Sequence, residues 1–143
     1  MCPVRIEKCT EDDLDLLSEM FRHLGEDEKT DSVWDDLRIR ETLLKYMGGG
    51  YNAYFFKKGD QLLGYALVNE KSFPFYLQHF FIRREHRRQH YGREAFGVLM
   101  HELGTDTIDL DVFVWNSRGL AFWRSLGFTD RCMMMRYQAP ESK

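Results

Sequence analysis

Residues 75–103 read FYLQHFFIRREHRRQHYGREAFGVLMHEL, and three consecutive segments of this stretch decide the fold. Tyr76–Ile82 is an aromatic and apolar run of strand length, Arg83–Gly92 is an arginine-rich polar turn, and Tyr91–Leu103 has helical spacing. The first N–H groups of a helix have no intrahelical partner and lie at the positive end of its dipole. A strand, a basic turn and a helix in this order therefore predict an anion-binding site at the turn.

The charge of the chain is unevenly distributed. The net charge is −3, and residues 1–50 carry 13 acidic against 7 basic side chains. The turn at 83–93 instead has five arginines against Glu85 alone. One compact basic patch in an acidic chain argues against general nucleic-acid binding and favours a small polyanion. The acidic first third could attract a cationic substrate, although acidic helices are commonly just solvated surfaces.

Length and composition indicate one globular domain over residues 1–143, with a disordered tail at 138–143. Cys2, Cys9 and Cys132 lack the spacing of metal ligands and suit reduced thiols in a cytoplasm. No apolar run reaches the length of a membrane span, and the N-terminus lacks a signal-peptide pattern. We therefore expect a cytoplasmic protein without a metal site and without a membrane or nucleic-acid partner.

The turn carries a specific motif. Arg87-Arg88-Gln89-His90-Tyr91-Gly92 resembles the pyrophosphate loop of the GNAT family of N-acetyltransferases, which reads Gln/Arg-x-x-Gly-x-Gly/Ala. Arg87 takes the first position and Gly92 the last, but His90 stands where the family usually has its first glycine. A His backbone is less permissive than Gly at positive φ. Either the turn stays in ordinary φ/ψ space, or cofactor binding is weakened.

A second motif follows in the order and at the separation that the family shows. Residues 116–128 read NSRGLAFWRSLGF and resemble its closing motif: an Asn at a strand end, a helix, then an aromatic pair before Gly-Phe. Asn116 matches the family residue that contacts the cofactor, and it is also a good helix cap. Trp123 stands where many members have the Tyr that protonates the departing thiolate. An indole N–H is a hydrogen-bond donor but not a useful proton source.

The remaining segments predict an α/β (α+β) fold with the element order βααβββαβαβ. Thr10 and Asp13 should form a capping box, Gly25 should end the first helix, and Asp31 or Ser32 should cap the second. The resemblance adds a mixed, mostly antiparallel sheet that is flanked by helices and splayed open beside the central strand. The expected strands are 4–9, 51–56, 62–68, 76–82, 108–115 and 128–137, and the expected helices are 11–24, 34–47, 91–103 and 117–126.

The resemblance also implies where acetyl-CoA binds. It places pantetheine beside the central strand and the pyrophosphate over the turn, held by backbone N–H groups and arginines. The implied cofactor-binding residues are Phe80, Phe81, Ile82, Arg87, Arg88, Gln89, His90, Tyr91, Gly92, Arg93, Asn116 and Phe122.

Acetyl transfer to an amine also requires groups that move protons. Asp111 is one candidate base, because Leu-Asp-Val at 110–112 resembles the Leu-Glu-Val of ribosomal-protein acetyltransferases, although Asp is shorter by one methylene. His79 is a second candidate base, and a satisfied core histidine is the alternative. For the acid, Trp123 is either a donor to the thioester or a packed core aromatic. Water, Tyr137 or Tyr91 could replace the missing tyrosine.

We therefore expect an acetyl-CoA-dependent N-acetyltransferase that transfers the acetyl group directly to a primary amine, with positioning rather than a covalent intermediate. A small cationic amine is the expected acceptor, met by acids near the first two helices. A protein N-terminus or lysine is an alternative acceptor, and a homodimer is left open. Two further alternatives are a catalytically silent acetyl-CoA-binding or sensing module and a basic-patch interaction domain. The acids in question are Glu26, Asp27, Glu28, Asp31, Asp35 and Asp36.

Overall fold

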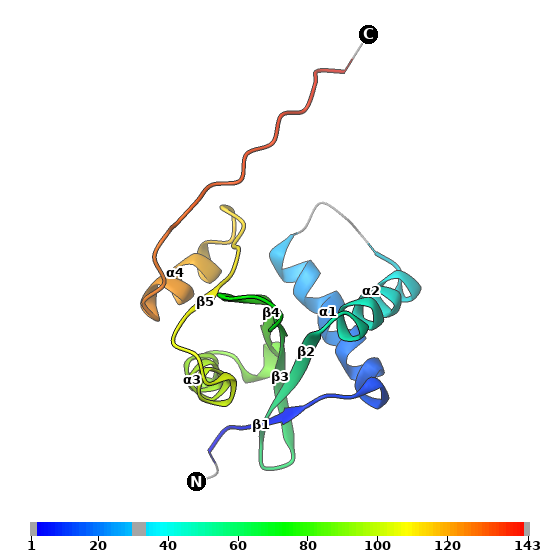
Figure 1. Cartoon of the computed structure of the whole chain (residues 1–143), viewed down its shortest axis with the longest axis vertical. Helices are drawn as coiled ribbons and strands as arrows, with labels where there is room; N and C mark the ends of the chain where they lie inside the picture. Colours follow the sequence, from blue (N-terminus) through cyan, green and yellow to red (C-terminus); the bar gives the residue numbers. More distant parts are fainter. Residues whose placement is uncertain (1–2, 30–33, 142–143) are drawn as a thin grey trace. The chain divides into compact units, whose positions relative to one another are not determined.

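The computed structural model describes residues 3–29 and 34–141, and the chain divides into two compact units, Met1–Phe113 and Val114–Lys143. The first unit contains a five-stranded sheet with the strand order β1-β2-β3-β4-β5 and three of the α-helices (Figure 1). The second unit contains the helix α4 and the segment that follows it.

The elements have the following bounds. The strands are β1 (Arg5–Lys8), β2 (Tyr51–Lys58), β3 (Gln61–Asn69), β4 (Phe75–Ile82) and β5 (Ile108–Asp109). The α-helices are α1 (Leu14–Glu28), α2 (Asp36–Gly48), α3 (Tyr91–Leu103) and α4 (Ser117–Ser125), with short 3-10 helices η1 (Glu11–Asp13) and η2 (Arg84–His86). Within residues 3–29 and 34–141, no helix is both long and apolar enough to span a membrane.

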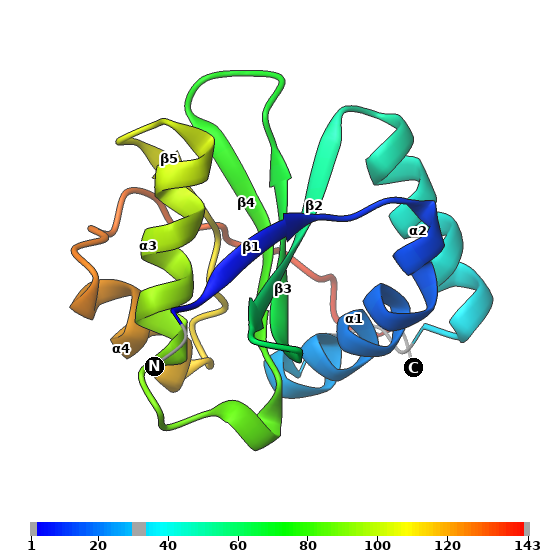
Figure 2. The ribbon, with the colours of Figure 1, turned by 90° about the horizontal axis from the view of Figure 1, so that it is seen from below.

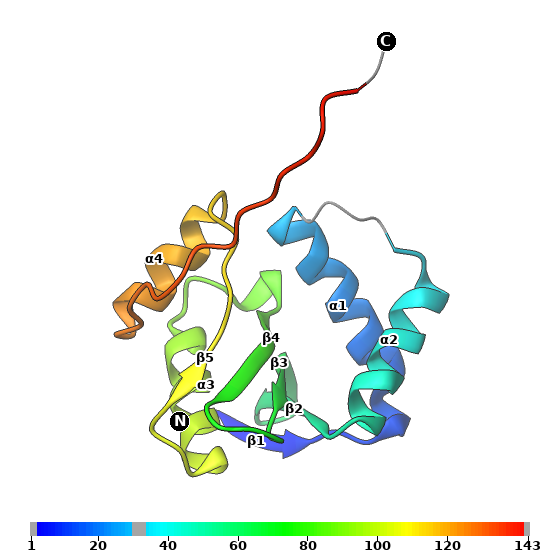
Figure 3. The ribbon, with the colours of Figure 1, turned by 45° about the horizontal axis from the view of Figure 1, so that its top comes forward.

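The sheet of the first unit lies between two layers of helices. β1, β2, β3 and β4 pair antiparallel in succession, and β5 pairs parallel to β4. The helices α1 and α2 cover one face of the sheet, and α3 covers the other (Figure 2, Figure 3). The predicted fold class, a mixed and mostly antiparallel sheet flanked by helices, is confirmed.

Each face of the sheet has its own apolar core. Beneath α1 and α2, the fully buried side chains include Leu17, Leu43 and Tyr65. On the α3 face, the Phe80 ring of β4 lies 5.4 Å from Phe56 and 6.3 Å from Phe96, measured between ring centroids. Alternate side chains of a strand point to opposite faces, so β4 contributes to both cores at once.

Local capping signals explain most helix boundaries. The predicted capping box is confirmed: the Asp12 N–H donates to the Thr10 hydroxyl, and the Thr10 N–H donates to the Asp13 carboxylate at 2.9 Å. The second helix is capped by Asp35, which accepts from the Arg38 N–H at 2.8 Å. The alternatives predicted from the sequence, residues 31 and 32, lie outside the described residues.

The prediction that Gly25 ends the first helix is wrong. α1 continues to Glu28, and Lys29 terminates it in the left-handed region with φ 51°. The extra turn carries Glu26 and Asp27, whose carboxylates are ion-paired with arginines beyond β4. Tertiary ion pairs therefore extend the helix past a residue that by itself favours termination.

Two predicted strands are shorter or absent. The alternating segment at 108–115 forms only the two-residue strand β5, because its pairing with β4 ends at Tyr76–Asp109. The closing strand predicted at 128–137 is not formed, and these residues carry no regular secondary structure. A strand requires a neighbour for its backbone hydrogen bonds, which alternation in the sequence cannot supply.

Candidate functional site

The open edge of β4 is the first feature of the site. β4 and β5 pair only through Phe75–Ile108 and Tyr76–Asp109, after which the two strands separate. The Arg83 N–H donates to the Leu63 carbonyl of β3, whereas the Ile82 carbonyl accepts from the Arg87 side chain. The N–H and C=O groups of successive residues point alternately to the two edges of a strand. Those of Phe80 and Ile82 therefore both point away from β3. The splayed edge that the resemblance implied is therefore present.

A β-bulge and a close approach of two backbones fix the position of this edge. The pairing of β3 with β4 shifts between Leu67 and Val68, which lie opposite His79 and Leu77, so Gln78 is an extra residue in β4. Further along, a Cβ on Gly64 would lie 1.9 Å from the Phe81 carbonyl oxygen. Only glycine permits this approach of β3 to β4, since any other side chain would meet the backbone.

The turn between β4 and α3 contains two non-glycine residues in the left-handed region. Arg88 has φ 64° and His90 has φ 65°, and His90 is the N-cap of α3. The first helical hydrogen bond runs from the Glu94 N–H to the His90 carbonyl, so the N–H groups of residues 91–93 precede the hydrogen-bond ladder. The sequence left open whether the turn stays in ordinary φ/ψ space, and it does not: His90 is left-handed at the position where the family motif has a glycine.

We expect His90→Gly to stabilise the protein by about 0.5–1 kcal/mol, because it relieves a left-handed L-residue while adding some freedom to the unfolded chain. Chemical denaturation of the two proteins measures this difference in the free energy of unfolding. Gln89→Gly is the matched control, since Gln89 is not at positive φ, and it should lose stability. A loss of stability in His90→Gly would instead assign a packing role to the imidazole.

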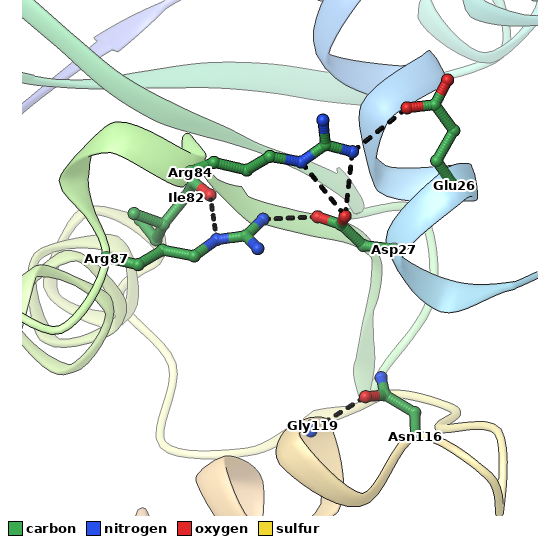
Figure 4. Close-up of polar contacts among 7 residues, drawn as sticks. All are labelled: Glu26, Asp27, Ile82, Arg84, Arg87, Asn116 and Gly119. Carbon is green, nitrogen blue, oxygen red and sulfur yellow. Dashed lines mark hydrogen bonds and ion pairs between the residues drawn. The ribbon is translucent and has the colours of Figure 1, made fainter.

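Two arginines of the turn, Arg84 and Arg87, are already paired with carboxylates of α1 (Figure 4). Arg87 donates to Asp27 at 2.5 Å, and Arg84 donates to Asp27 at 3.0 Å and to Glu26 at 3.1 Å. Arg83 forms a weaker contact of 3.3 Å with Glu19. Three of the five arginines in the basic patch predicted from the sequence are therefore ion-paired with carboxylates of α1.

Arg87 is additionally held by β4. Its Nε donates to the Ile82 carbonyl at 2.9 Å, and its guanidinium carbon lies 5.3 Å from the centre of the Phe81 ring. Burial disfavours the charged form of Asp27, but hydrogen bonds from Arg87 and Arg84 outweigh burial and hold the pKa of this carboxyl below its usual value. Arg88 is exposed, and no ion pair joins it to another residue in the described part of the chain.

Asp111 and Tyr76 lie where β4 and β5 separate. Tyr76 is the last β4 residue paired with β5, and Asp111 follows that strand by two residues. Burial and the neighbouring Asp111 carboxylate together raise the pKa of the Tyr76 hydroxyl above its ordinary value. The Asp111 side chain is exposed. The structure thus places an accessible carboxylate and a phenol at the start of the open edge.

His79 lies in the core rather than at an open surface. Its side chain is 8% exposed, Nδ1 lies 3.0 Å from the Tyr65 hydroxyl, and its ring centroid is 4.3 Å from that of Phe21. Burial lowers its pKa to about 3. The imidazole is therefore neutral at physiological pH and binds protons weakly.

The second unit contains the other predicted site residues. Asn116 caps α4 by accepting from the Gly119 N–H at 3.0 Å, as Figure 4 shows. The Trp123 ring packs edge-on against Phe122 and Phe128, with centroids 4.8 and 5.2 Å away. Within this unit, Trp123 is a packing residue between the helix and the segment after it.

Sequence reasoning did not identify three features that shape the first unit. An isolated glycine in the apolar run at 62–68 could have indicated the close approach at Gly64. No local signal pointed to the contact of Asp27 with Arg87, because the two residues are 60 positions apart. Nor did the sequence indicate that Tyr76 lies beside Asp111, because this placement follows from the register between β4 and β5.

Comparison with known proteins assigns this architecture to a family. The model of the acetyltransferase (GNAT) family matches residues 14–128, and the chain therefore belongs to this family of acetyltransferases. No curated protein matches the chain.

Solved structures share the fold at low sequence identity. A possible acetyltransferase from Clostridium difficile 630 is 16% identical, with a TM-score of 0.76 over 97% of this chain and 99% of that chain. A predicted acetyltransferase from Clostridium acetobutylicum, solved with acetyl-CoA, is 15% identical, with a TM-score of 0.71 over 94% and 96%. An aminoglycoside N-acetyltransferase in complex with coenzyme A is 12% identical, with a TM-score of 0.72 over 97% and 96%. At these identities the similarity concerns the fold alone.

Proposed function

We propose that this protein is an N-acetyltransferase that transfers an acetyl group from acetyl-CoA directly to a primary amine. The observation that carries the proposal is the parallel pair β4–β5, which separates after Tyr76 and leaves an open strand edge leading to the turn before α3. Membership of the GNAT family supports this reading, as do related folds solved with acetyl-CoA or coenzyme A. Cys9 and Cys132, both free thiols, suit a cytoplasmic location.

The residues of the first unit fit such a cosubstrate. Phe80 and Ile82 turn backbone groups away from β3, the side along which an amide-containing pantetheine arm would run like a neighbouring strand. The N–H groups at 88–93 and the exposed Arg88 would hold the diphosphate, with Gln89, Tyr91, Gly92 and Arg93 in the same turn. From the second unit, we assign Asn116 and Phe122 to cofactor contacts by their match to the family motif. Acetyl-CoA supplies an activated acyl group and a thiolate leaving group.

We assign the proton-accepting role to Asp111 rather than to His79. An amine attacks only after losing its proton, so the acceptor must be a deprotonated group that is accessible near the reacting atoms. Asp111 is exposed beside the start of the open edge, whereas His79 is buried and its pKa of about 3 makes it a poor base. Tyr76, next to Asp111, is a hydroxyl donor in the same place.

A small cationic amine is the proposed acceptor. Glu26 and Asp27 are compensated by arginines, and Asp36 pairs with Arg22 at 2.9 Å. Asp35 accepts from the backbone as a helix cap. The exposed Asp111 and the net charge of −3 favour a cation, and an aminoglycoside acetyltransferase shares the fold.

Two measurements, carried out one after the other, test the proposal. Calorimetric titration with acetyl-CoA should show binding, and its absence would leave the chain without the cosubstrate that the proposal requires. A panel of polyamines, aminosugars, amino acids and peptides should then release coenzyme A thiol with at least one cationic amine. Binding without turnover on any amine would favour a silent acetyl-CoA-binding module. That second candidate rests on Trp123, which occupies the position of the family's acidic tyrosine.

A further inference from the structure

We propose that Asp27 sets the anion affinity and selectivity of the turn before α3, by acting as an internal counter-ion that a ligand must displace from Arg84 and Arg87. The inference rests on the proposed function for the identity of that ligand, the diphosphate of coenzyme A. The contacts of Asp27 with Arg84 and Arg87, on which the inference is based, do not depend on which ligand binds.

The geometry of Asp27 is that of a clamped anion. One carboxylate oxygen accepts from Nε and Nη2 of Arg84 at 3.2 and 3.0 Å, and the other accepts from Nη2 of Arg87 at 2.5 Å. Two guanidinium groups that converge on one pair of oxygens form the arrangement that proteins use to bind phosphate and carboxylate ligands. Here α1 of the same chain supplies the carboxylate.

The clamp is less screened than an ordinary surface ion pair. This holds for its Arg87 half: the Asp27 side chain is 28% exposed and the Arg87 side chain 24%, whereas Arg22 and Asp36, another ion pair of the α1–α2 layer, are 44% and 73% exposed. The Arg84 side chain is 48% exposed, so the Arg87 contact contributes most of the cost of displacement. Partly buried pairs are weakened less by water and salt than exposed pairs. Displacing Asp27 therefore has a substantial cost, which the incoming anion must offset.

Arg87 does not depend on Asp27 for its position. Its Nε is bonded to the Ile82 carbonyl at 2.9 Å, and its guanidinium stacks near the Phe81 ring. When the Asp27 charge is removed, the guanidinium remains anchored on the turn and loses its counter-ion. The site would then accept any anion more readily, including chloride.

Selectivity follows from this competition. A singly charged anion offers the arginines no more than Asp27 already provides, so it gains little by exchange. A diphosphate brings more negative charge and more acceptor oxygens, and it can contact both guanidinium groups together. Asp27 thus restricts the turn to multiply charged phosphates.

The test compares Asp27→Asn with the wild-type protein by calorimetry, using coenzyme A and inorganic pyrophosphate as probes at low and high sodium chloride. At low salt, the dissociation constants of both probes should fall about tenfold in the variant, because the internal competitor is neutralised. At high salt this advantage should disappear, since chloride then occupies the vacated arginines. Asp27→Glu, which keeps the charge, should bind like the wild-type protein.

Glu19→Gln is the matched control. Glu19 also joins α1 to the turn, but through Arg83, whose ion pairs are with Glu19 and Glu85 and not with Asp27. The dissociation constants of Glu19→Gln for coenzyme A and pyrophosphate should therefore equal those of the wild-type protein. If Asp27→Asn does not fold, as judged by its thermal unfolding, Glu26→Gln replaces it, with a smaller tightening because only one contact of Arg84 is lost.

The outcomes separate this inference from the proposed function. Equal or weaker binding of pyrophosphate by Asp27→Asn at low salt overturns the competition. Tighter binding of pyrophosphate without any binding of coenzyme A supports the competition and rejects the proposed function. Tighter binding of both probes supports the two together.

Discussion

Asp111→Asn should lower the turnover number for amine acetylation by about 10²–10⁴-fold while leaving the dissociation constant for acetyl-CoA unchanged. An amide has the size of the carboxylate but cannot take a proton from the attacking amine. Steady-state kinetics with the best amine of the panel, combined with calorimetry, measures both quantities.

The control for this variant is Asp106→Asn, an exposed carboxylate five residues earlier in the chain. It should retain the turnover of the wild-type protein, because Asp106 lies before β5 and outside the region where β4 and β5 separate. If Asp111→Asn also keeps its turnover, the base lies elsewhere, and bound water becomes the first alternative. A variant that loses acetyl-CoA binding instead would indicate that Asp111 supports the cosubstrate site.

Gly64→Ala should destabilise the protein by about 3 kcal/mol or more, and lower its melting temperature by on the order of 10 °C. The added Cβ would lie 1.9 Å from the Phe81 carbonyl oxygen, so β3 and β4 must move apart in the middle of the sheet. The same movement would displace the open edge of β4. Thermal unfolding followed by circular dichroism measures the effect.

Gly97→Ala is a matched substitution with the opposite expected sign. Gly97 is exposed within α3, and its added Cβ would have no heavy atom within 4 Å. Alanine in a helix interior is favoured over glycine by about 1 kcal/mol, so this variant should be more stable than the wild-type protein. A Gly64→Ala protein as stable as Gly97→Ala would show that β3 and β4 have room to adjust.

The local signals of the sequence were reliable where the interacting residues are close together in the chain. The capping box at Thr10 closes within four residues, and β2 and β3 are joined by a short hairpin, so their patterns needed no distant information. The strand, turn and helix at 75–103 were predicted for the same reason. The substitution of His90 for glycine could be read from the motif, but its left-handed conformation could not.

The sequence by itself determined the element order up to α4, the family and the segment at which we propose that an anionic cosubstrate binds. Tertiary structure alone decided which arginines of that segment are ion-paired with α1. Asp27 lies 60 residues before Arg87, and a charge so distant in the chain leaves no local pattern. Tertiary structure likewise buried His79 against Tyr65 and left Asp111 exposed, because burial depends on which elements pack over a residue. Sequence periodicity specifies a face, whereas the pKa and the ion partner of a side chain depend on what covers that face.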